Sequence, residues 1–405
     1  MKGCQPLKIF IPVILLHLAL PAQFPYPDFE IVESIPLETT LDNPEIRNTA
    51  DVWLAMINGA RQTIDIEQFY ISNQENGALE TVIRALEQAS RRGVAIRIIA
   101  DRRMANTYPE TLERLNRHKN ITTRKLTVFN ANGGVQHSKF FIVDRTQVFL
   151  GSQNFDWRAL THIHEIGVRI RQPQYAEQMT RLFELDWQQS EDNRLRSVKP
   201  AQQPQWLEMT MEPDQNLRFF AAASPPDNIP PAFTADLPAL IRLIDSAENR
   251  VWVQLLSYSP SSRKAWFGDL DSALRRAAQR GVDVRLLCSD WCQHRYEMPF
   301  LKQLVVMDSL DVKLSTIPEY SGGYIPFARV EHCKMMMIDN NLSWIGTSNW
   351  KRDYFYQSRN VAVIVEDQQV NATLARIFLK SWDGPYAWRI DPEKEYNPKF
   401  YGEKD

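Results

Sequence analysis

The sequence predicts an α/β protein in which one layered domain occurs twice, and three observations support this prediction. Residues 92–99 (RGVAIRII) are answered by residues 280–287 (RGVDVRLL), 188 positions later. Helical and strand patterns alternate in the same order in both halves, which is typical of layered α/β domains. A polar motif that starts at His137 recurs at His332 with the same internal spacing. Solenoid repeats are far shorter than this period, so the repeat indicates a duplicated domain.

The same order of elements is expected in both halves. A helix (51–60; 237–247) precedes a strand (63–70; 250–258), and a second helix follows (77–91; 267–280). The second helices end at Gly93 and Gly281, which fit the glycine position of a helix C-cap. An apolar strand (94–99; 282–287), two buried strands (140–143 and 148–150; 335–338 and 344–345) and a closing helix (175–188; 370–381) complete each half.

This order of elements places the domain boundaries. We expect the first lobe at residues 28–195 and the second lobe at residues 231–397. Residues 196–230 lie between them, are rich in Pro, Gln and Glu, and are predicted to form a linker. At 405 residues, the chain is long enough for each lobe to bury its own core.

The N-terminus has the pattern of a targeting segment. Two lysines precede an apolar run at residues 9–20, and small residues follow it, so residues 1–22 are predicted to be a secretory signal peptide. The alternative is a retained N-terminal anchor. No later stretch is apolar enough to span a bilayer, and we expect no stable span once the signal is removed. Cys288 and Cys292 are expected to be packed thiols, with a disulfide between them as the alternative.

Composition excludes two broad classes of protein. The chain is 44% hydrophobic and 24% charged, with a net charge of −2. These proportions exclude extensive disorder. They also exclude a uniformly cationic protein that grips nucleic acid or anionic membranes by bulk charge. Positive charge that binds a polyanion must therefore be placed locally.

The repeated motif reads His-x-Lys-x4-Asp-x6-Gly-(Ser/Thr)-x-Asn. A single His-x-Lys pair is most often accidental surface polarity, whereas two copies with identical spacing, one in each half, make chance a poor explanation. The first copy is His137, Lys139, Asp144, Gly151, Ser152 and Asn154, and the second is His332, Lys334, Asp339, Gly346, Thr347 and Asn349.

The residue types in this motif suit a phosphodiester. Alternate residues of a strand share a face, so each motif His projects with its Lys, while Ser138 and Cys333 point into packing. If the halves meet about a pseudo-two-fold axis, two imidazoles, two ammonium groups and two amides converge. The Lys and Asn side chains would hold the nonbridging oxygens. One His would attack phosphorus and the other would protonate the leaving oxygen. Because these cations supply the charge, we expect no metal and no other cofactor.

With its two motif copies, the chain resembles the phospholipase D superfamily of HKD phosphodiesterases. Three stretches, 151–161 (GSQNFDWRALT), 324–332 (YIPFARVEH) and 382–386 (WDGPY), are similar to the animal endolysosomal phospholipase D-like subgroup. That subgroup is known for 5′-exonuclease action on single-stranded nucleic acid and is linked to lysosomal phospholipid synthesis. The resemblance implies two α/β/α sandwich lobes, a phosphohistidine intermediate and metal independence.

The resemblance also implies different roles for the two histidines. In the family, a glutamate placed as Glu165 is here bonds the far nitrogen of the motif His, and the matching position in the second half is Asn360. A carboxylate partner raises the basicity of an imidazole. We therefore expect Glu165 to pair with His137, making His137 the nucleophile and His332 the general acid.

Further motif residues are expected to support the site or to contact the substrate. Asp144 and Asp339 stand at strand ends before turn residues and are predicted to bond local backbone. Ser152 and Thr347 are predicted to support the phosphate or the neighbouring turn. The residues predicted to contact the substrate are Phe155 and Trp350, each directly after the motif Asn, and the cationic Arg329.

The leading interpretation is an exported, metal-independent phosphodiesterase that cleaves single-stranded DNA or RNA from the 5′ end. The alternative within the same chemistry is a phospholipase D or transphosphatidylase, because water and an alcohol compete for the same phosphohistidine. A non-catalytic polyanion-binding protein is the alternative from another class. In a bacterium the protein would be periplasmic or secreted, and in a eukaryote it would lie in the endolysosomal lumen or outside the cell.

Overall fold

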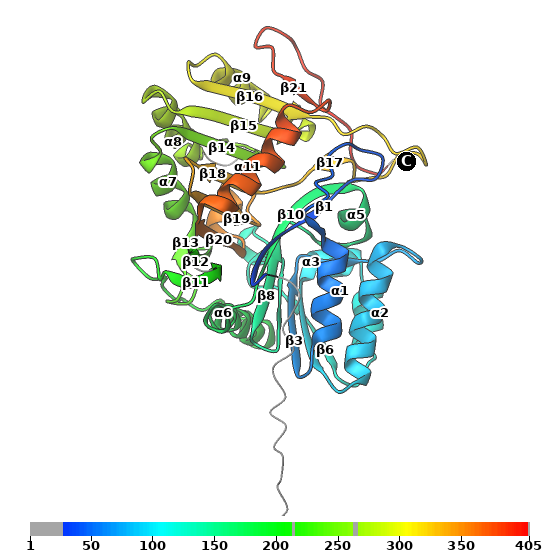
Figure 1. Ribbon diagram of the computed structural model, residues 1–405. Coiled ribbons are helices and arrows are strands. Elements are labelled where there is room, and N and C mark those ends of the chain that lie inside the picture. The colour runs from blue at the N-terminus through cyan, green and yellow to red at the C-terminus, as the bar shows by residue number, and fades with distance from the viewer. Residues whose placement is uncertain (1–26, 213–214, 262–265, 404–405) are drawn as a thin grey trace, which may run out of the picture.

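The computed structural model describes residues 27–212, 215–261 and 266–403, and the chain forms two lobes, each built on one large sheet (Figure 1). The predicted signal peptide lies outside the described residues. The first sheet has the strand order β2-β1-β10-β8-β7-β3-β5-β6, and the second has the order β11-β12-β20-β19-β18-β14-β15-β16-β21. The predicted α/β class with two similar lobes is confirmed.

The first lobe carries its helices on both faces of the sheet. Its strands are β1 (Phe29–Ser34), β2 (Arg47–Asn48), β3 (Thr63–Gln68), β4 (Ile71–Ser72), β5 (Ala95–Asp101), β6 (Ile121–Leu126), β7 (Phe140–Val143), β8 (Gln147–Gly151), β9 (Phe155–Asp156) and β10 (Ile163–Ile170). Its helices are α1 (Thr49–Gly59), α2 (Ala78–Arg91), α3 (Arg102–Thr107), α4 (Glu110–Asn116), α5 (Trp157–Thr161) and α6 (Pro173–Asp192), with a short 3₁₀ turn at Asn130–Asn132.

The second lobe repeats this plan with local differences. Its strands are β11 (Leu207–Glu212), β12 (Gln215–Ser224), β13 (Thr234–Ala235), β14 (Arg250–Leu255), β15 (Asp283–Ser289), β16 (Leu310–Ser315), β17 (Val330–Glu331), β18 (Met335–Ile338), β19 (Leu342–Gly346), β20 (Asn360–Glu366) and β21 (Ala387–Arg389). Its helices are α7 (Asp236–Ser246), α8 (Asp269–Gln279), α9 (Met298–Val305), α10 (Arg352–Tyr356) and α11 (Gln368–Trp382), with a 3₁₀ turn at Asp290–Cys292.

The predicted elements formed where local chemistry specified them. Asn48 caps α1 by accepting a hydrogen bond from the backbone N–H of Ala50. Pro173 opens α6 at its first turn, where a missing N–H costs nothing. Gly93 and Gly281 follow α2 and α8 with φ of 96° and 84°, a conformation that suits glycine. The two C-cap predictions are therefore confirmed.

The segment predicted as a linker is in part a piece of the second sheet. Strands β11 and β12 lie within residues 196–230, and β12 pairs antiparallel with β20 as β1 pairs with β10. Leu217 and Phe219 face the core between the lobes, while Phe220 faces the outer core of the second lobe. The polar residues at 198–206 favoured a linker, so the alternating apolar pattern of β12 could not be recognised from the sequence. The second lobe therefore begins before residue 231.

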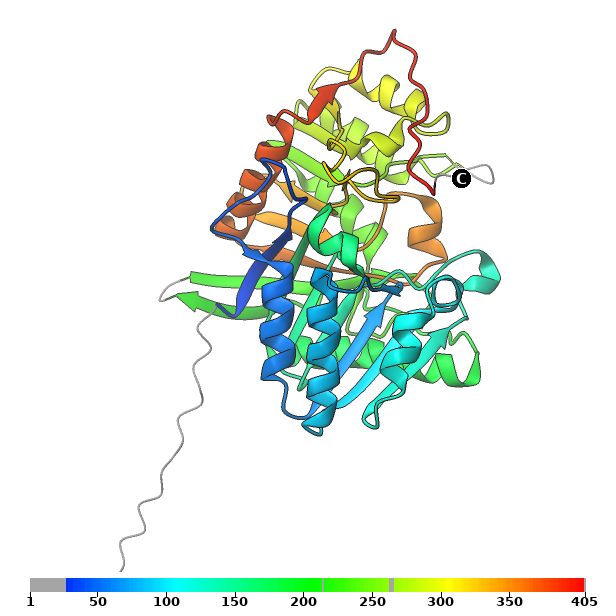
Figure 2. The same cartoon turned by 90° about the vertical axis from the view of Figure 1, so that its right-hand side faces the viewer.

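One hydrophobic core is shared by both lobes. Its members include Tyr175 and Phe183 of α6 and Leu374 and Phe378 of α11, packed with strand residues from both sheets. Separate clusters lie under α1 and α2 in the first lobe and under α7 and α8 in the second. Figures 1 and 2 show α1 and α2 side by side on the outer face of the first sheet. The shared core holds the two lobes in one fixed relation.

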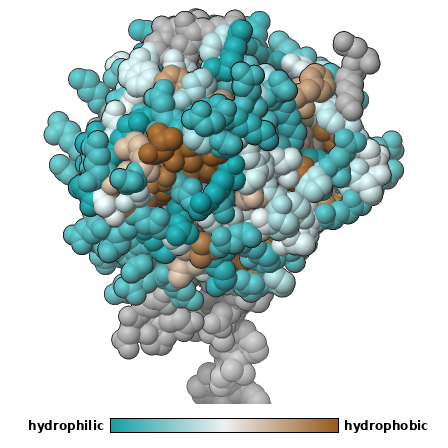
Figure 3. All heavy atoms as spheres, turned by 90° about the horizontal axis from the view of Figure 1, so that it is seen from above, coloured by the Kyte–Doolittle hydropathy of each residue, from teal (hydrophilic) through white to brown (hydrophobic). Residues whose placement is uncertain are grey.

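The surface agrees with the near-neutral composition. Seen from the end of the second lobe, the visible face is mostly hydrophilic and is interrupted by hydrophobic patches (Figure 3). Within the described residues, no helix is long and apolar enough to cross a membrane. Cys288, Cys292 and Cys333 are buried free thiols, so the expectation of packed thiols is confirmed.

Candidate active site

The two motif histidines line one cavity of about 230 Å³ at the junction of the lobes. His137 lies just before β7, and His332 lies between β17 and β18. Asn154 and Asn349 line the same cavity, and the side-chain oxygen of each amide is buried without a hydrogen-bond partner. The duplicated motif thus forms a single composite site, in which two amide oxygens have no hydrogen-bond partner in the protein.

Each motif lysine lies beside its histidine, in the residues that lead directly into β7 or β18. The ammonium group of Lys139 donates a hydrogen bond to the backbone oxygen of His137 at 2.7 Å, and Lys334 does the same to His332 at 2.7 Å. The intervening Ser138 turns the other way, where its hydroxyl donates to Glu67 at 2.6 Å. The expected direction of these side chains is confirmed.

The partners of the histidines cross between the lobes, which corrects the expected pairing. Glu165 does not pair with His137. Its Oε2 lies 2.6 Å from Nδ1 of His332, while Nδ1 of His137 lies 3.0 Å from Oδ1 of Asn360. The spacing along the chain identified Glu165 and Asn360 as the orienting residues. It did not show which histidine each of them contacts. Each histidine is therefore oriented by a residue of the other lobe.

The backbone explains the crossing. The N–H of His332 donates to the carbonyl of His164 at 2.9 Å, and β17 pairs in parallel with β10, setting Glu331 opposite His164. In the mirrored arrangement, the N–H of His137 donates to the carbonyl of Arg359 at 2.9 Å. Each histidine is thus fixed to the backbone one residue before its orienting side chain.

The amide of Asn360 sets the tautomer of His137. Its Nδ2 donates to the backbone oxygen of Tyr354 at 2.8 Å, so its Oδ1 is the atom that faces His137 and also accepts from Thr347 at 3.0 Å. An acceptor at Oδ1 requires a proton on Nδ1 of His137, which leaves a lone pair on Nε2. His137 therefore presents a neutral, nucleophilic nitrogen to the cavity.

Electrostatics in the site favour an anion. Burial lowers the pKa of His137 and of His332 well below 6.5, and both motif lysines add to this effect. Burial lowers the pKa of Lys334 to about 8, and burial together with the charge of Lys334 lowers that of Lys139. Burial also raises the pKa of Glu165 to about 8, against the opposing effect of Lys334. A bound phosphate would stabilise the charged forms of these closely spaced, buried lysines.

The motif aspartates bond backbone, but the backbone of a neighbouring strand distant in sequence and not the local turn that was expected. The carboxylate of Asp144 accepts from the backbone N–H groups of Arg61, Gln62 and Thr63 at 2.9, 2.7 and 2.9 Å. Asp339 accepts in the same way from Glu248, Asn249 and Arg250. Each aspartate ties the end of a hairpin strand to the start of the neighbouring strand, β3 or β14.

Ser152 and Thr347 support the strands that carry the orienting residues. The Ser152 hydroxyl donates to the carbonyl of Ile166 and accepts from its N–H, at 3.1 and 3.0 Å. Thr347 accepts from the N–H of Val361 at 3.1 Å and reaches Asn360 directly. Both residues therefore hold the strand next to Glu165 or Asn360, which agrees with a supporting role.

The three residues predicted to contact the substrate lie elsewhere. Phe155 is fully buried and packs on Trp53 in the core of the first lobe. Trp350 is 1% exposed and belongs to the core of the second lobe. Arg329 donates to the carbonyls of Pro318 and Leu37 instead of facing the histidines. Each aromatic directly follows a cavity-lining Asn, and neighbouring residues of an extended chain face opposite sides.

Other aromatic side chains line the cavity and were missed from the sequence. The edges of His137 meet the rings of Phe69 and Tyr354, at centroid distances of 4.9 and 4.8 Å. The aromatic residues of the lining come from separate segments of the chain: Phe69 and Tyr70, Tyr108, Trp291, Phe327, and Tyr354.

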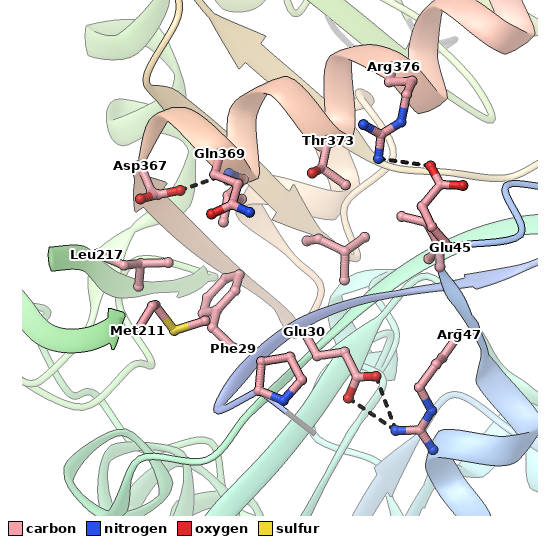
Figure 4. A pocket seen from close by; sticks show the side chains of 14 residues that line it. Phe29, Glu30, Glu45, Arg47, Met211, Leu217, Asp367, Gln369, Thr373 and Arg376 are labelled. Carbon is pink, nitrogen blue, oxygen red and sulfur yellow. Dashed lines mark hydrogen bonds and ion pairs between the residues drawn. The ribbon is translucent and has the colours of Figure 1, made fainter. Parts of the chain in front are cut away.

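A second hollow, of about 420 Å³, lies between β1 and α11 and differs in character (Figure 4). Its charged side chains pair with one another: Arg47 lies 3.1 Å from Glu30, and Arg376 lies 2.9 Å from Glu45. It holds no histidine, lysine or cysteine. Of the two hollows, only the one at the motif histidines has the groups for acid–base or nucleophilic chemistry.

One cluster in the described residues has metal-ligand types, but its groups are already paired. His164, Glu331 and Cys333 bring their ligand atoms within 4.8 Å of one another. Nδ1 of His164 lies 2.9 Å from Glu331, and its Nε2 lies 2.9 Å from Glu33. Burial raises the pKa of the Cys333 thiol far above its usual range. A doubly hydrogen-bonded imidazole has no lone pair for a metal ion.

Sequence comparison identifies relatives along most of the chain. Residues 53–187 and 240–382 match the family model described as "Cardiolipin synthase, PLD-like domain". The human protein named "5'-3' exonuclease PLD3" is 31% identical over 418 residues, covering 93% of this chain and 84% of its own. "Phospholipase D Z" of Dictyostelium discoideum is 29% identical over 388 residues, covering 89% of this chain and 90% of its own.

Solved structures share the fold. Phosphatidylserine synthase from Haemophilus influenzae superimposes with a TM-score of 0.59 at 11% identity, covering 84% of this chain and 85% of that chain. Polyphosphate kinase from Porphyromonas gingivalis gives a TM-score of 0.57 at 15% identity and covers 90% of this chain and 48% of that chain. At such identities the likeness concerns the architecture alone.

Proposed function

The chain belongs to the phospholipase D superfamily of phosphodiesterases, and we propose that it removes nucleotides from the 5′ end of single-stranded nucleic acid through a phosphohistidine. The observation that carries this proposal is the cavity in which both motif histidines meet six aromatic side chains. Aromatic rings bind unpaired bases by stacking, which is worth about 1–3 kcal/mol per base. Curated relatives named as 5′-3′ exonucleases support the same substrate class.

In the proposed first step, Nε2 of His137 attacks phosphorus, and the bond from phosphorus to the leaving oxygen breaks. His332 gives its Nε2 proton to that oxygen. In the second step His332 takes a proton from water, the resulting hydroxide attacks the phosphohistidine, and His137 is released. Lys139, Lys334 and the two motif asparagines would hold the nonbridging oxygens, where negative charge is stabilised in both steps.

The two histidines keep the roles expected from the sequence. The contacts that support these roles differ from the expected ones. Glu165 lies against His332, and because burial raises the pKa of Glu165 to about 8, the pair holds a shared proton that keeps Nε2 of His332 protonated for its role as general acid. The amide of Asn360 orients His137 without adding charge and leaves its Nε2 unprotonated, as a nucleophile requires.

The second candidate is a phospholipase D or transphosphatidylase. It is favoured by the apolar share of the cavity wall, which includes Met104, Ile163, Leu256 and Val330, and by the relative named "Phospholipase D Z". An acyl chain or a headgroup alcohol would then occupy the space assigned here to a base.

A side-by-side assay separates the two. Purified protein and a His137→Ala control would be given 5′-hydroxyl and 5′-phosphate oligonucleotides and, separately, mixed phospholipid vesicles. We expect nucleotide release that is lost in the variant and unaffected by a chelator. Headgroup release or exchange without nucleotide release would reverse the order of the two candidates. Binding of oligonucleotide without turnover of either substrate would support a non-catalytic protein.

We also propose that the protein is exported and works in the secretory pathway, in the periplasm or outside the cell in a bacterium, or in the endolysosomal lumen or outside the cell in a eukaryote. The support is the sequence pattern of residues 1–22. N-terminal sequencing of protein recovered from the native compartment would show whether the chain starts after residue 22.

A further inference from the structure

The end of the chain returns to the wall of the active-site cavity. After β21 the chain runs back toward the junction of the lobes (Figures 1 and 2). There the ring of Tyr401 stacks on Trp291, with centroids 4.1 Å apart and planes within 14°. Trp291 itself lines the cavity that holds both histidines. Tyr401 therefore lies directly behind one wall of the site.

The backbone of the same segment holds a second part of that wall. The N–H of Phe327 donates to the carbonyl of Tyr401 at 2.7 Å, and the hydroxyl of Tyr324 donates to the carbonyl of Gly402 at 2.7 Å. Lys399 pairs with Asp290, the residue before Trp291. Phe327 lines the cavity beside Trp291. Residues 399–402 thus contact both aromatic members of this wall.

The wall loop needs such support because its backbone is strained. Phe327 and Arg329 have φ of 57° and 54°, in the left-handed region that residues with a Cβ rarely adopt. Arg329 is anchored by the first lobe, since its N–H donates to the carbonyl of His162 at 2.8 Å. At Phe327 the backbone N–H is held by the C-terminal segment. The shape of the wall therefore depends on Tyr401.

We propose that Tyr401 is a specificity-determining positioning residue, which acts through Trp291 and Phe327 on the group that enters the cavity. The inference rests on the proposed function only in taking this cavity as the place of the substrate's terminal group. The catalytic side chains are held by cross-lobe contacts that do not involve Tyr401. Loss of the Tyr401 ring should therefore raise KM and leave kcat nearly unchanged.

The chain offers a matched control in the same segment. Tyr396 also stacks on a tryptophan, Trp388, with centroids 5.5 Å apart and planes within 26°. Trp388 is not among the residues that line the catalytic cavity. Tyr396→Ala thus removes a comparable aromatic contact from the C-terminal segment without touching the wall. Tyr401→Phe, which keeps the ring and the backbone carbonyl, serves as the conservative variant.

The experiment compares wild type, Tyr401→Ala, Tyr401→Phe and Tyr396→Ala in two measurements on the full chain. The first is hydrogen exchange of residues 320–329, which does not depend on any activity. The second is the steady-state kinetics of a 5′-hydroxyl oligonucleotide. We expect faster exchange and a KM about five-fold higher in Tyr401→Ala alone, with kcat within about two-fold.

Unchanged exchange in Tyr401→Ala, or an equal rise in KM in Tyr396→Ala, would overturn the proposal. A wild-type protein that cleaves only phospholipid would defeat the nuclease proposal and not this one. The same KM comparison would then be made with vesicles of the phospholipid it cleaves, and the exchange result would stand as it is.

Discussion

Glu165 in the first lobe and Asn360 in the second occupy matching places in the repeat, and each follows a buried cation. In the first lobe that cation is His164, which lies between Glu33 and Glu331. In the second it is Arg359, which pairs with Asp186 at 2.7 Å and donates to the carbonyl of Ser224 at 2.9 Å. The scaffold is repeated, whereas the groups that take up or give away protons are not.

The difference teaches how a duplicated site acquires distinct roles. Both lobes present the same His and Asn to the cavity and place a lysine against the backbone of each histidine, so holding a phosphate is a symmetric task. Transferring a proton is an asymmetric task, and the asymmetry comes from one carboxylate and one amide behind the histidines. Because the contacts cross, each lobe decides the chemistry of the other lobe's histidine.

The strongest test of this asymmetry is to remove each histidine in turn. His137→Asn should lose more than about 10⁴-fold in kcat on every substrate, because no group is left to form the covalent bond. His332→Asn should lose as much kcat on an oligonucleotide, whereas the first step on an aryl phosphodiester, whose leaving group needs no proton, should stay fast and appear as a burst. Rapid-mixing assays with both substrates measure this contrast.

The covalent intermediate gives an independent readout of the same pair. In His332→Asn the second step lacks its base, so a phosphohistidine should accumulate on residue 137 and be seen by mass spectrometry. A phosphoenzyme mapped to His332 in the His137→Asn variant would instead exchange the two roles.

The buried cations should respond differently to pH. His164→Gln removes the cation that lies between two buried carboxylates, which should cost about 3–5 kcal/mol of unfolding free energy. Although burial opposes it, contacts with Cys333, Glu331 and Glu33 raise the pKa of His164 well above its usual value. Its contribution is therefore fully present below about pH 6.5 and is lost as pH rises through the raised pKa.

Urea unfolding at about pH 6 and about pH 9 measures this effect. Wild type should lose more stability between the two values than His164→Gln does. Arg359→Gln is the matched variant in the other lobe, and its pH dependence should stay like that of wild type because arginine does not titrate in this range. Equal pH dependence in all three proteins would contradict the assignment.

Glu165 offers a smaller, catalytic test. The lowered pKa of His332 predicts higher activity at acidic pH, because the general acid loses its proton as pH rises. Glu165→Gln removes the group that shares the proton of His332, so kcat should fall about 100-fold and the decline should begin at lower pH. Profiles of kcat/KM from about pH 4 to pH 8 test this, and an unmoved profile would remove Glu165 from proton transfer.

The sequence predicted the scaffold and the motif well, because these depend on local patterns and on repetition. Periodic apolar residues placed the strands on either side of each motif, and Gly93 and Gly281 marked the helix ends. The pairing of Glu165 could not be predicted by counting, since β10 meets β17 only through the tertiary fold. The aromatic wall was hidden for the same reason: Phe69 and Trp291 come from loops that only the folded chain brings together.

The smallest expected effect lies where the lobes are most alike. Asp144 and Asp339 each accept hydrogen bonds from three successive backbone N–H groups, at the ends of the strands away from the histidines. Asp144→Asn and Asp339→Asn should each cost about 1–2 kcal/mol, since an amide replaces a charged acceptor. Measured by urea unfolding, the two losses should be similar, with kcat unchanged. If either variant lost kcat while it was fully folded, the motif aspartate would contribute to catalysis. Even the shared part of the scaffold would then differ between the lobes.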